Sequence, residues 1–167
     1  HAVDFFDRNE RISLVPPSAA PFVPSDIITA TASGTLFAAA GKGKIGVYDA
    51  RSFAWKELPP IPVIIRLEVT KNMLWVVNQE GCLYAVSLDH IDGGWETKLD
   101  GGVSNVVATP DWFYAIARKN NEAAQLFAYH GHDGTLASKI SPKSLPAENL
   151  QWKHVAVFAD TLYLAGE

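Results

Sequence analysis

The sequence lacks the features that stabilise small secreted scaffolds or bind anionic polymers. Its 167 residues hold a single cysteine, Cys82, which excludes an internal disulfide framework. No cluster of lysine or arginine exceeds two neighbours and the formal net charge is −4, so the electrostatic footprint of a protein that binds nucleic acid is missing. No apolar run reaches the roughly 18 residues that a membrane helix needs. We therefore expect no nucleic-acid partner and no direct membrane insertion, and the sequence leaves the cellular compartment open.

Apolar residues are nevertheless abundant. They make up 48% of the chain, against 19% charged residues, which excludes a disordered polymer and allows a sizeable core. We expect one domain over residues 1–167, or an excerpt of a larger domain of the same kind.

A repeating pattern organises the apolar residues. Four stretches align on a turn followed by an apolar-aromatic strand, and the aligned aromatic residues are Phe37, Trp75, Phe113 and Tyr163. In each complete unit one apolar strand precedes this strand, and two more follow after polar turns. Strand-length runs separated by turn residues predict an all-β fold, and four strands in about 40 residues is the size of one β-propeller blade.

The two ends of the sequence fit the same template as partial units. Phe6–Asp7 parallels Tyr48–Asp49, so the chain starts at the third strand of a unit and ends after the second strand of another. The sequence thus predicts about four four-stranded blade-equivalents. If strands from both ends close the ring, segment 4–7 should pair beside segment 161–166, because closure removes exposed sheet edges. If the chain is an excerpt, its open ends should self-associate. Glu122–Gln125 has a helical composition, but the alignment favours a strand at 126–129.

The unit resembles the quinoprotein-type propeller repeat found in BamB-like proteins. The resemblance is carried by CLYAVSLDHIDGGWETKLDGGV from Cys82, QLFAYHGHDGTLASKI from Gln125 and GKIGVYDARSFAWKEL from Gly43. It implies that Trp55 and Trp95 pack between adjacent blades. Catalytic quinoproteins are far longer and hold a cofactor and a calcium ion. Because this chain has no vicinal cysteines and no cluster of carboxylate and amide oxygens spaced for calcium, we expect no cofactor.

Two other repeat families are similar to shorter parts of the chain. Tectonin-type lectin repeats resemble the stretch from Trp55 to Tyr84, and the opening FFDR with GKGKIGVYD resembles the N-terminal propeller of the vacuolar sorting tether subunit Vps11. The first resemblance implies glycan binding, which needs polar groups repeated at equivalent blade positions. Asn78 and Asn120 occupy near-equivalent positions in two of the units, but the first unit has Lys42 at this position.

Clusters that suggest metal chemistry are better explained as turns. His130, His132 and Asp133 supply at most part of a zinc shell. Asp89 and Asp92 lack the further ligands that calcium requires. Cys82 has no base at motif spacing, so we interpret it as a small half-buried residue. We therefore assign no catalytic and no metal-binding residue.

Trp112 is the strongest candidate for an interaction residue. It follows a Pro110–Asp111 turn, where the aligned units have leucine, and exposed tryptophans dominate interface hot spots. Arg118, Lys119 and the inserted loop 141–149 are expected to form a polar rim beside it.

The leading functional hypothesis is a non-catalytic scaffold, a subunit of an assembly or tethering complex, that presents Asp111, Trp112, Arg118 and Lys119 to a protein partner. The alternatives are a carbohydrate-binding tectonin-like module and a fragment of a larger quinoprotein-like enzyme whose active site lies in other blades.

Overall fold

The computed structural model describes residues 3–7, 10–14, 29–33, 36–41, 44–49, 54–119, 122–141 and 151–166. Its regular elements are β-strands, joined by turns and one short 3-10 helix, η2 (Ile91–Gly93). The all-β prediction is therefore confirmed. No helix of the described segments is long and apolar enough to cross a membrane.

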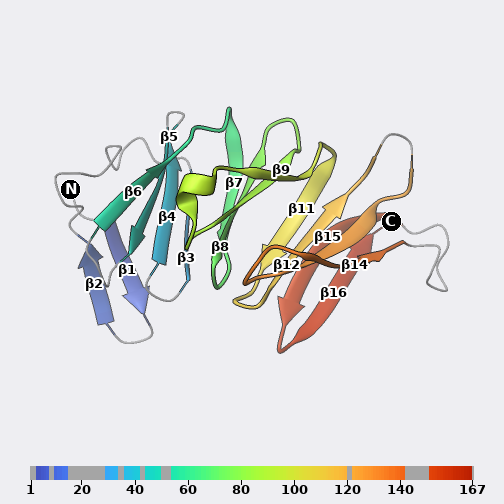
Figure 1. Ribbon diagram of the computed structural model, residues 1–167. Coiled ribbons are helices and arrows are strands. Elements are labelled where there is room, and N and C mark those ends of the chain that lie inside the picture. Colours follow the sequence, from blue (N-terminus) through green and yellow to red (C-terminus); the bar gives the residue numbers. More distant parts are fainter. Residues whose placement is uncertain are drawn as a thin grey trace.

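Three complete four-stranded sheets form the centre of the molecule (Figure 1). The first sheet contains β3 (Thr29–Ser33), β4 (Leu36–Gly41), β5 (Lys44–Asp49) and β6 (Ala54–Leu58). The second contains β7 (Ile64–Val69), β8 (Met73–Asn78), β9 (Leu83–Ser87) and β10 (Glu96–Leu99). The third contains β11 (Val103–Ala108), β12 (Trp112–Ala117), β13 (Gln125–His130) and β14 (Leu136–Ile140). Each is an antiparallel meander in chain order, as in a propeller blade.

Two half-sheets flank these blades. β1 (Val3–Asp7) pairs with β2 (Glu10–Leu14), and β15 (Trp152–Phe158) pairs with β16 (Thr161–Gly166). The predicted split into a third-and-fourth-strand pair at one end and a first-and-second-strand pair at the other is confirmed. The strand predicted at 126–129 is also present, within β13.

Of the two alternatives that the sequence left open, closure of the ring by the end strands of one chain is not observed. Among the described strands, β1 pairs only with β2, and β16 pairs only with β15. The two half-sheets lie at opposite ends of the row of blades (Figure 1). The physical reason is that the row of sheets spans only part of a ring, so β1 and β16 do not meet.

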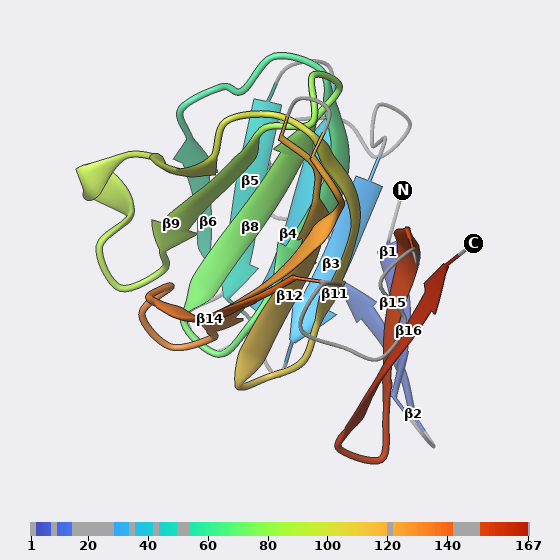
Figure 2. The same cartoon turned by 90° about the vertical axis from the view of Figure 1, so that its right-hand side faces the viewer.

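The first strand of each sheet lies at the inner edge of the row. β3 contacts β7, β7 contacts β11, and β11 contacts β15. In Figure 2, which shows the molecule from its right-hand side, the β15–β16 pair lies beside the complete blades and in front of β1–β2. The inner strands β7, β11 and β15 each carry a bulge near their start, which leaves Ile65, Ser104 and Lys153 outside the pairing register. This repeated bulge was not visible as a sequence motif.

The structural repeat differs by one residue from the repeat predicted by aligning aromatic residues. Val69 pairs with Leu74, and Ala108 pairs with Phe113, across equivalent turns. Phe113 is thus the equivalent of Leu74, and Trp75 that of Tyr114. Because a shift of one residue reverses the face of a strand, Trp75 points to the following blade and Phe113 to the preceding blade.

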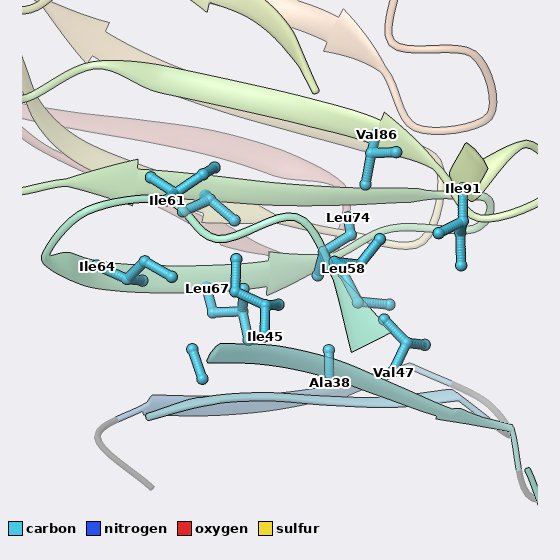
Figure 3. Packing of buried hydrophobic residues seen from close by; sticks show 13 residues of the cluster. Ala38, Ile45, Val47, Leu58, Ile61, Ile64, Leu67, Leu74, Val86 and Ile91 are labelled. Carbon is cyan, nitrogen blue, oxygen red and sulfur yellow. The ribbon is translucent and has the colours of Figure 1, made fainter. Parts of the chain in front are cut away.

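Among the side chains that the structure describes, the core consists of three layers between adjacent sheets. The layer between the first two blades gathers small and branched side chains, including Ala38, Ile45, Leu67, Leu74 and Val86. Figure 3 shows these side chains meeting between β4–β6 and β7–β9, with Ile91 of η2 closing one end. Each layer removes apolar surface from water, which is the main favourable term in folding.

Aromatic side chains dominate the layer between the second and third blades. The rings of Trp75 and Phe113 stack with centroids 4.2 Å apart and planes 6° apart. Tyr129 packs at 5.4 Å from Trp75, and burial raises the pKa of its phenol to about 12. The third layer lies between the third blade and the β15–β16 pair, and it contains Ile116 of β12 and Trp152 of β15.

A hydrogen-bond chain fixes the edge of this aromatic layer. Trp75 Nε1 donates to Thr70 Oγ1 at 3.0 Å, and the Thr70 hydroxyl donates to the Gly131 carbonyl at 2.7 Å. A Cβ on Gly131 would lie 2.7 Å from the Pro110 carbonyl oxygen, so this close approach requires glycine. Thr70 is fully buried, and its hydroxyl accepts the hydrogen bond of the Trp75 indole while it donates to the Gly131 carbonyl, which also accepts from the Asn72 N–H at 3.2 Å.

Trp95 meets the expectation of inter-blade packing only in part. It is half-buried against the first core layer, and its Nε1 donates to the Pro59 carbonyl at 2.8 Å. It therefore joins the first and second blades at their rim, not at their centre. The Trp55 side chain lies outside what the structure describes, although β6 includes its backbone.

We predict that Trp75→Ala destabilises the protein by about 3–5 kcal/mol, because it leaves a large cavity and removes the hydrogen bond that the buried Thr70 hydroxyl accepts. Trp95→Ala should cost less, since part of that ring already contacts water. Urea unfolding of both variants measures the difference. An equal loss for the two would show that their burial does not determine their contributions.

Candidate interaction surface

The turns of the blades fall into two sets at opposite ends of the strands. We call the lower face the end that carries the turns from first to second and from third to fourth strands. The turns that join β7 to β8, β11 to β12 and β15 to β16 lie at the bottom of Figure 1, whereas the turn that contains η2 reaches higher. The upper face carries the turns from second to third strands and the links between blades. In the second and third blades and in the β15–β16 hairpin, the lower-face turns are residues 70–72, 88–95, 109–111, 131–135 and 159–160.

The lower face is acidic. Its described turns expose five aspartates and one lysine. These residues are Asp89, Asp92, Asp111, Asp133, Asp160 and Lys71. The described upper-face turns are more balanced, because Arg118 and Lys119 offset Glu80, Asp100 and Glu122. A face with one excess sign of charge attracts partners of the opposite sign.

A strip of aromatic and imidazole rings crosses the third blade on this face. The Trp112 ring lies 4.6 Å from the His130 ring, and the His130 ring lies 5.5 Å from that of His132. His132 Nε2 is 3.1 Å from Asp133 Oδ2. The strip therefore runs continuously from Trp112 to Asp133.

Asp133 is held by its own turn. Its Oδ1 accepts hydrogen bonds from the Thr135 backbone N–H at 2.9 Å and from the Thr135 hydroxyl at 2.8 Å. These two hydrogen bonds lower the pKa of the Asp133 carboxyl below its usual value. The turn thus presents a fixed, ionised carboxylate to solvent.

A cleft of about 410 Å³ lies next to Asp133, between the second and third blades. Trp95, His90 and Glu96 line it together with Asp133. The hydrogen bond from Trp95 to Pro59 fixes the orientation of the indole. Glu96 Oε1 also lies 2.8 Å from Lys98 Nζ. The cleft thus combines one aromatic surface with the carboxylate of Asp133, which suits a cationic side chain, while the carboxylate of Glu96 is already paired with Lys98.

The structure divides the four predicted interaction residues into two groups. Asp111 and Trp112 lie on the lower face, at the start of β12, whereas Arg118 and Lys119 follow its end on the upper face. Six residues of strand separate the groups by about 20 Å. Arg118 Nη2 hydrogen-bonds Gln151 Oε1. The expected rim of Arg118 and Lys119 beside Trp112 is therefore not formed, and most of the inserted loop, residues 142–150, lies outside the described segments.

Trp112 differs from its true equivalent in the second blade. The pairing registers make Met73 that equivalent, not the leucine predicted from the alignment. Met73 is 3% exposed, whereas Trp112 is only half-buried. Its ring rests on His130 and approaches Tyr114, with centroids 6.2 Å apart. Its role in binding stays a prediction.

Asn78 has a structural role that excludes it as a glycan ligand. It is 4% exposed, and its Oδ1 accepts hydrogen bonds from the backbone N–H groups of Glu80 and Cys82. The two residues predicted to match it, Lys42 and Asn120, lie outside the described segments. Cys82 is buried, with its Sγ 3.9 Å from Asp100 Oδ1. In the described part of the chain, no three His, Cys, Asp or Glu side chains gather as a metal site would require.

Reasoning from the sequence missed the Trp95 cleft, because it treated Trp95 as a core residue and Asp133 as an ordinary turn residue. The sequence did contain a signal for the acidic face. Sorting the charged residues by the class of turn that carries them would have shown that Asp89, Asp92, Asp111, Asp133 and Asp160 share one face.

Comparison with known proteins identifies the fold and no family. No protein-family model and no curated protein matches the sequence. Solved structures match over most of this chain. The N-terminal domain of Nup159 has a TM-score of 0.56 and 15% identity, over 83% of this chain and 38% of that chain. BamB from Moraxella catarrhalis has a TM-score of 0.55 and 14% identity, over 83% and 39%.

A third similar structure is KlAtg21 in complex with the coiled-coil of AgAtg16. It has a TM-score of 0.53 and 13% identity, over 82% of this chain and 47% of that chain. The chain thus spans less than half the length of each of these three proteins. The chain has a β-propeller repeat fold, and the predicted resemblance to BamB-like repeats is confirmed at the level of that fold.

Two neighbouring residues of β12 test how far Trp112 belongs to the core. We predict that Phe113→Ala costs about 3–5 kcal/mol, because Phe113 is fully buried against Trp75. Trp112→Ala should cost about 1–2 kcal/mol, because its ring is half-buried at the end of the strand. The midpoint of urea unfolding would measure the loss of stability in both variants, provided that the slope of the transition is unchanged. A Trp112→Ala loss as large as that of Phe113→Ala would place Trp112 in the core and remove it from the interaction surface.

Proposed function

We propose that the chain is a non-catalytic propeller scaffold whose lower face binds a basic segment of a protein partner, as part of an assembly or tethering complex. The observation that carries this proposal is the pairing of the Trp95 cleft with an acidic face. A protein partner is supported by similar structures that were determined as complexes with proteins. The similar structures include dbp5 bound to nup159, and Atg21 with the coiled-coil of Atg16.

The chemistry of the cleft favours arginine or lysine. A guanidinium or ammonium group over the face of an indole is attracted by the ring quadrupole, by about 0.5–2 kcal/mol depending on its exposure. The carboxylate of Asp133 would neutralise the bound charge, since that of Glu96 already pairs with Lys98, and a guanidinium can form two parallel hydrogen bonds with one carboxylate. Asp111 and Trp112 extend the same surface beyond the histidines, so that a peptide lying along the strip would reach both ends.

A binding measurement with synthetic peptides tests the proposal. We expect fluorescein-labelled Arg- or Lys-rich decapeptides to bind, with an affinity that falls as salt rises, because exposed charges are screened. A Glu-rich decapeptide of equal length should not bind. Trp95→Ala should weaken binding about tenfold or more, in line with the loss of a hot-spot aromatic.

Two further variants sharpen the test. Asp133→Asn keeps the shape of the side chain and removes its charge, so it should weaken binding and reduce the salt dependence. Ile65→Ala truncates a side chain that is 55% exposed at the upper end of β7, and it serves as the control that should leave binding unchanged. Equal binding of the acidic peptide, or full binding by Trp95→Ala, would contradict the proposal.

A further inference from the structure

Another pocket, which we call the upper pocket, opens between the second and third blades, at the opposite end of the strands from the Trp95 cleft. Its volume is about 180 Å³, and most of its lining comes from the starts of β7 and β11. The bulged residues of these two strands, Ile65 and Ser104, both line it. Bulges are common beside binding sites, because they re-aim side chains. The upper pocket thus arises where the inner strands depart from regular pairing.

The floor of the upper pocket is aliphatic. Val77 and Val106 are buried, and both belong to the core layer between the second and third blades. Ile65 and Val103 complete the apolar lining. The volume is below the roughly 300 Å³ at which pockets for whole small molecules begin. An apolar cavity of about 150 Å³ holds one benzene molecule, so the upper pocket has room for one branched aliphatic side chain.

Two polar side chains at the rim of the upper pocket offer N–H donors. Asn105 Oδ1 accepts a hydrogen bond from the Val155 N–H at 3.3 Å, which leaves the two N–H bonds of its Nδ2 group for another acceptor. Arg66 Nε donates to Glu68 Oε1 at 2.8 Å. This bond uses one of the five N–H donors of the guanidinium and fixes its plane. Within the part of the chain that the structure describes, the Nη groups of Arg66 and the Nδ2 group of Asn105 make no hydrogen bond.

The backbone is strained just before β7. Val63 has a φ of 44°, a left-handed conformation that is rare for a β-branched residue. Its carbonyl accepts a hydrogen bond from the Gln79 N–H at 2.8 Å, which ties this segment to the end of β8. Val63 is 60% exposed and lies two residues before Ile65, so it adds an apolar side chain at the same end of the strand. Backbone strain of this kind gathers at binding sites.

We propose that the upper pocket binds the carboxyl terminus of a partner protein whose last residue is valine, leucine or isoleucine. The aliphatic side chain fills the pocket over Val77 and Val106, and the terminal carboxylate accepts hydrogen bonds from Arg66 and Asn105. A terminal residue carries both groups on one Cα atom, which suits an apolar pocket of this size with donors at its rim. Capture of a terminal carboxylate by fixed N–H groups is a recurring mode of peptide recognition.

Fluorescence polarisation with labelled glycine-serine decapeptides tests the class of ligand. The peptides differ only at the carboxyl end, which is leucine with a free carboxylate, leucine amide, serine with a free carboxylate, or an internal leucine-glutamate pair before an amide. We expect the leucine carboxylate peptide to bind and each of the others to bind at least about tenfold more weakly, because each lacks the side chain or the terminal carboxylate. Equal binding of either amide, or no binding of the leucine carboxylate peptide, would overturn the proposal.

Two variants of the chain test where the leucine carboxylate peptide binds. Arg66 is 55% exposed, so Arg66→Gln should keep the urea midpoint and weaken binding about tenfold. Lys139→Gln is the matched control, because it removes an equal charge from exposed β14, and it should leave binding unchanged. Ile65→Ala should also weaken this peptide, although it spares the basic peptides of the lower face, since the two sites lie at opposite ends of β7. Full binding by Arg66→Gln or by Ile65→Ala would place the peptide elsewhere and overturn the proposal.

Discussion

The contact of Trp75 with the third blade is the interaction on which the rest of the described structure depends. Its indole supplies a flat surface for Phe113 and a donor for Thr70, and the Thr70 hydroxyl in turn reaches Gly131. Stacking and hydrogen bonding act on the same side chain, so neither can be lost without disturbing the other. Burial makes both stronger, because an unpaired polar group in this layer would have no water to replace its partner.

The Trp75 contact also positions the lower face. Lys71 N–H donates to the Pro110 carbonyl at 2.8 Å, and Gly131 N–H donates to the Asp111 carbonyl at 2.7 Å. Three turns from two blades are thereby held in one arrangement. Two of these turns carry Asp111 and Asp133, and the cleft beside Trp95 lies next to them. A rigid core thus presents an acidic surface on short turns. Binding residues commonly lie on loops that a rigid scaffold positions in this way.

Much of the fold could be predicted from the sequence, because a repeat constrains every unit at once. The blade size, the split units at both ends and the strand at 126–129 all followed from spacing. The alignment of one blade on the next could not be predicted to the residue. Aromatic residues occur on both faces of these strands, so Phe113 was aligned with Trp75 because both are aromatic. That one-residue error also assigned Trp112 to the wrong equivalent. The grouping of Trp112 with Arg118 failed for a simpler reason: residues six apart in a strand lie at its opposite ends.

Hydrogen exchange at the tryptophan indoles tests most directly whether the Trp75 contact joins the second and third blades into one cooperative unit. Heteronuclear NMR would follow the Nε1–H groups of Trp75 and Trp95 in deuterated solvent. Trp75 should exchange only through global unfolding, with the same free energy as that measured by urea, while Trp95 at the blade rim should exchange sooner through local opening. If Trp75 exchanges as fast as Trp95, the blades open independently, and Trp75 is not the interaction that holds them together.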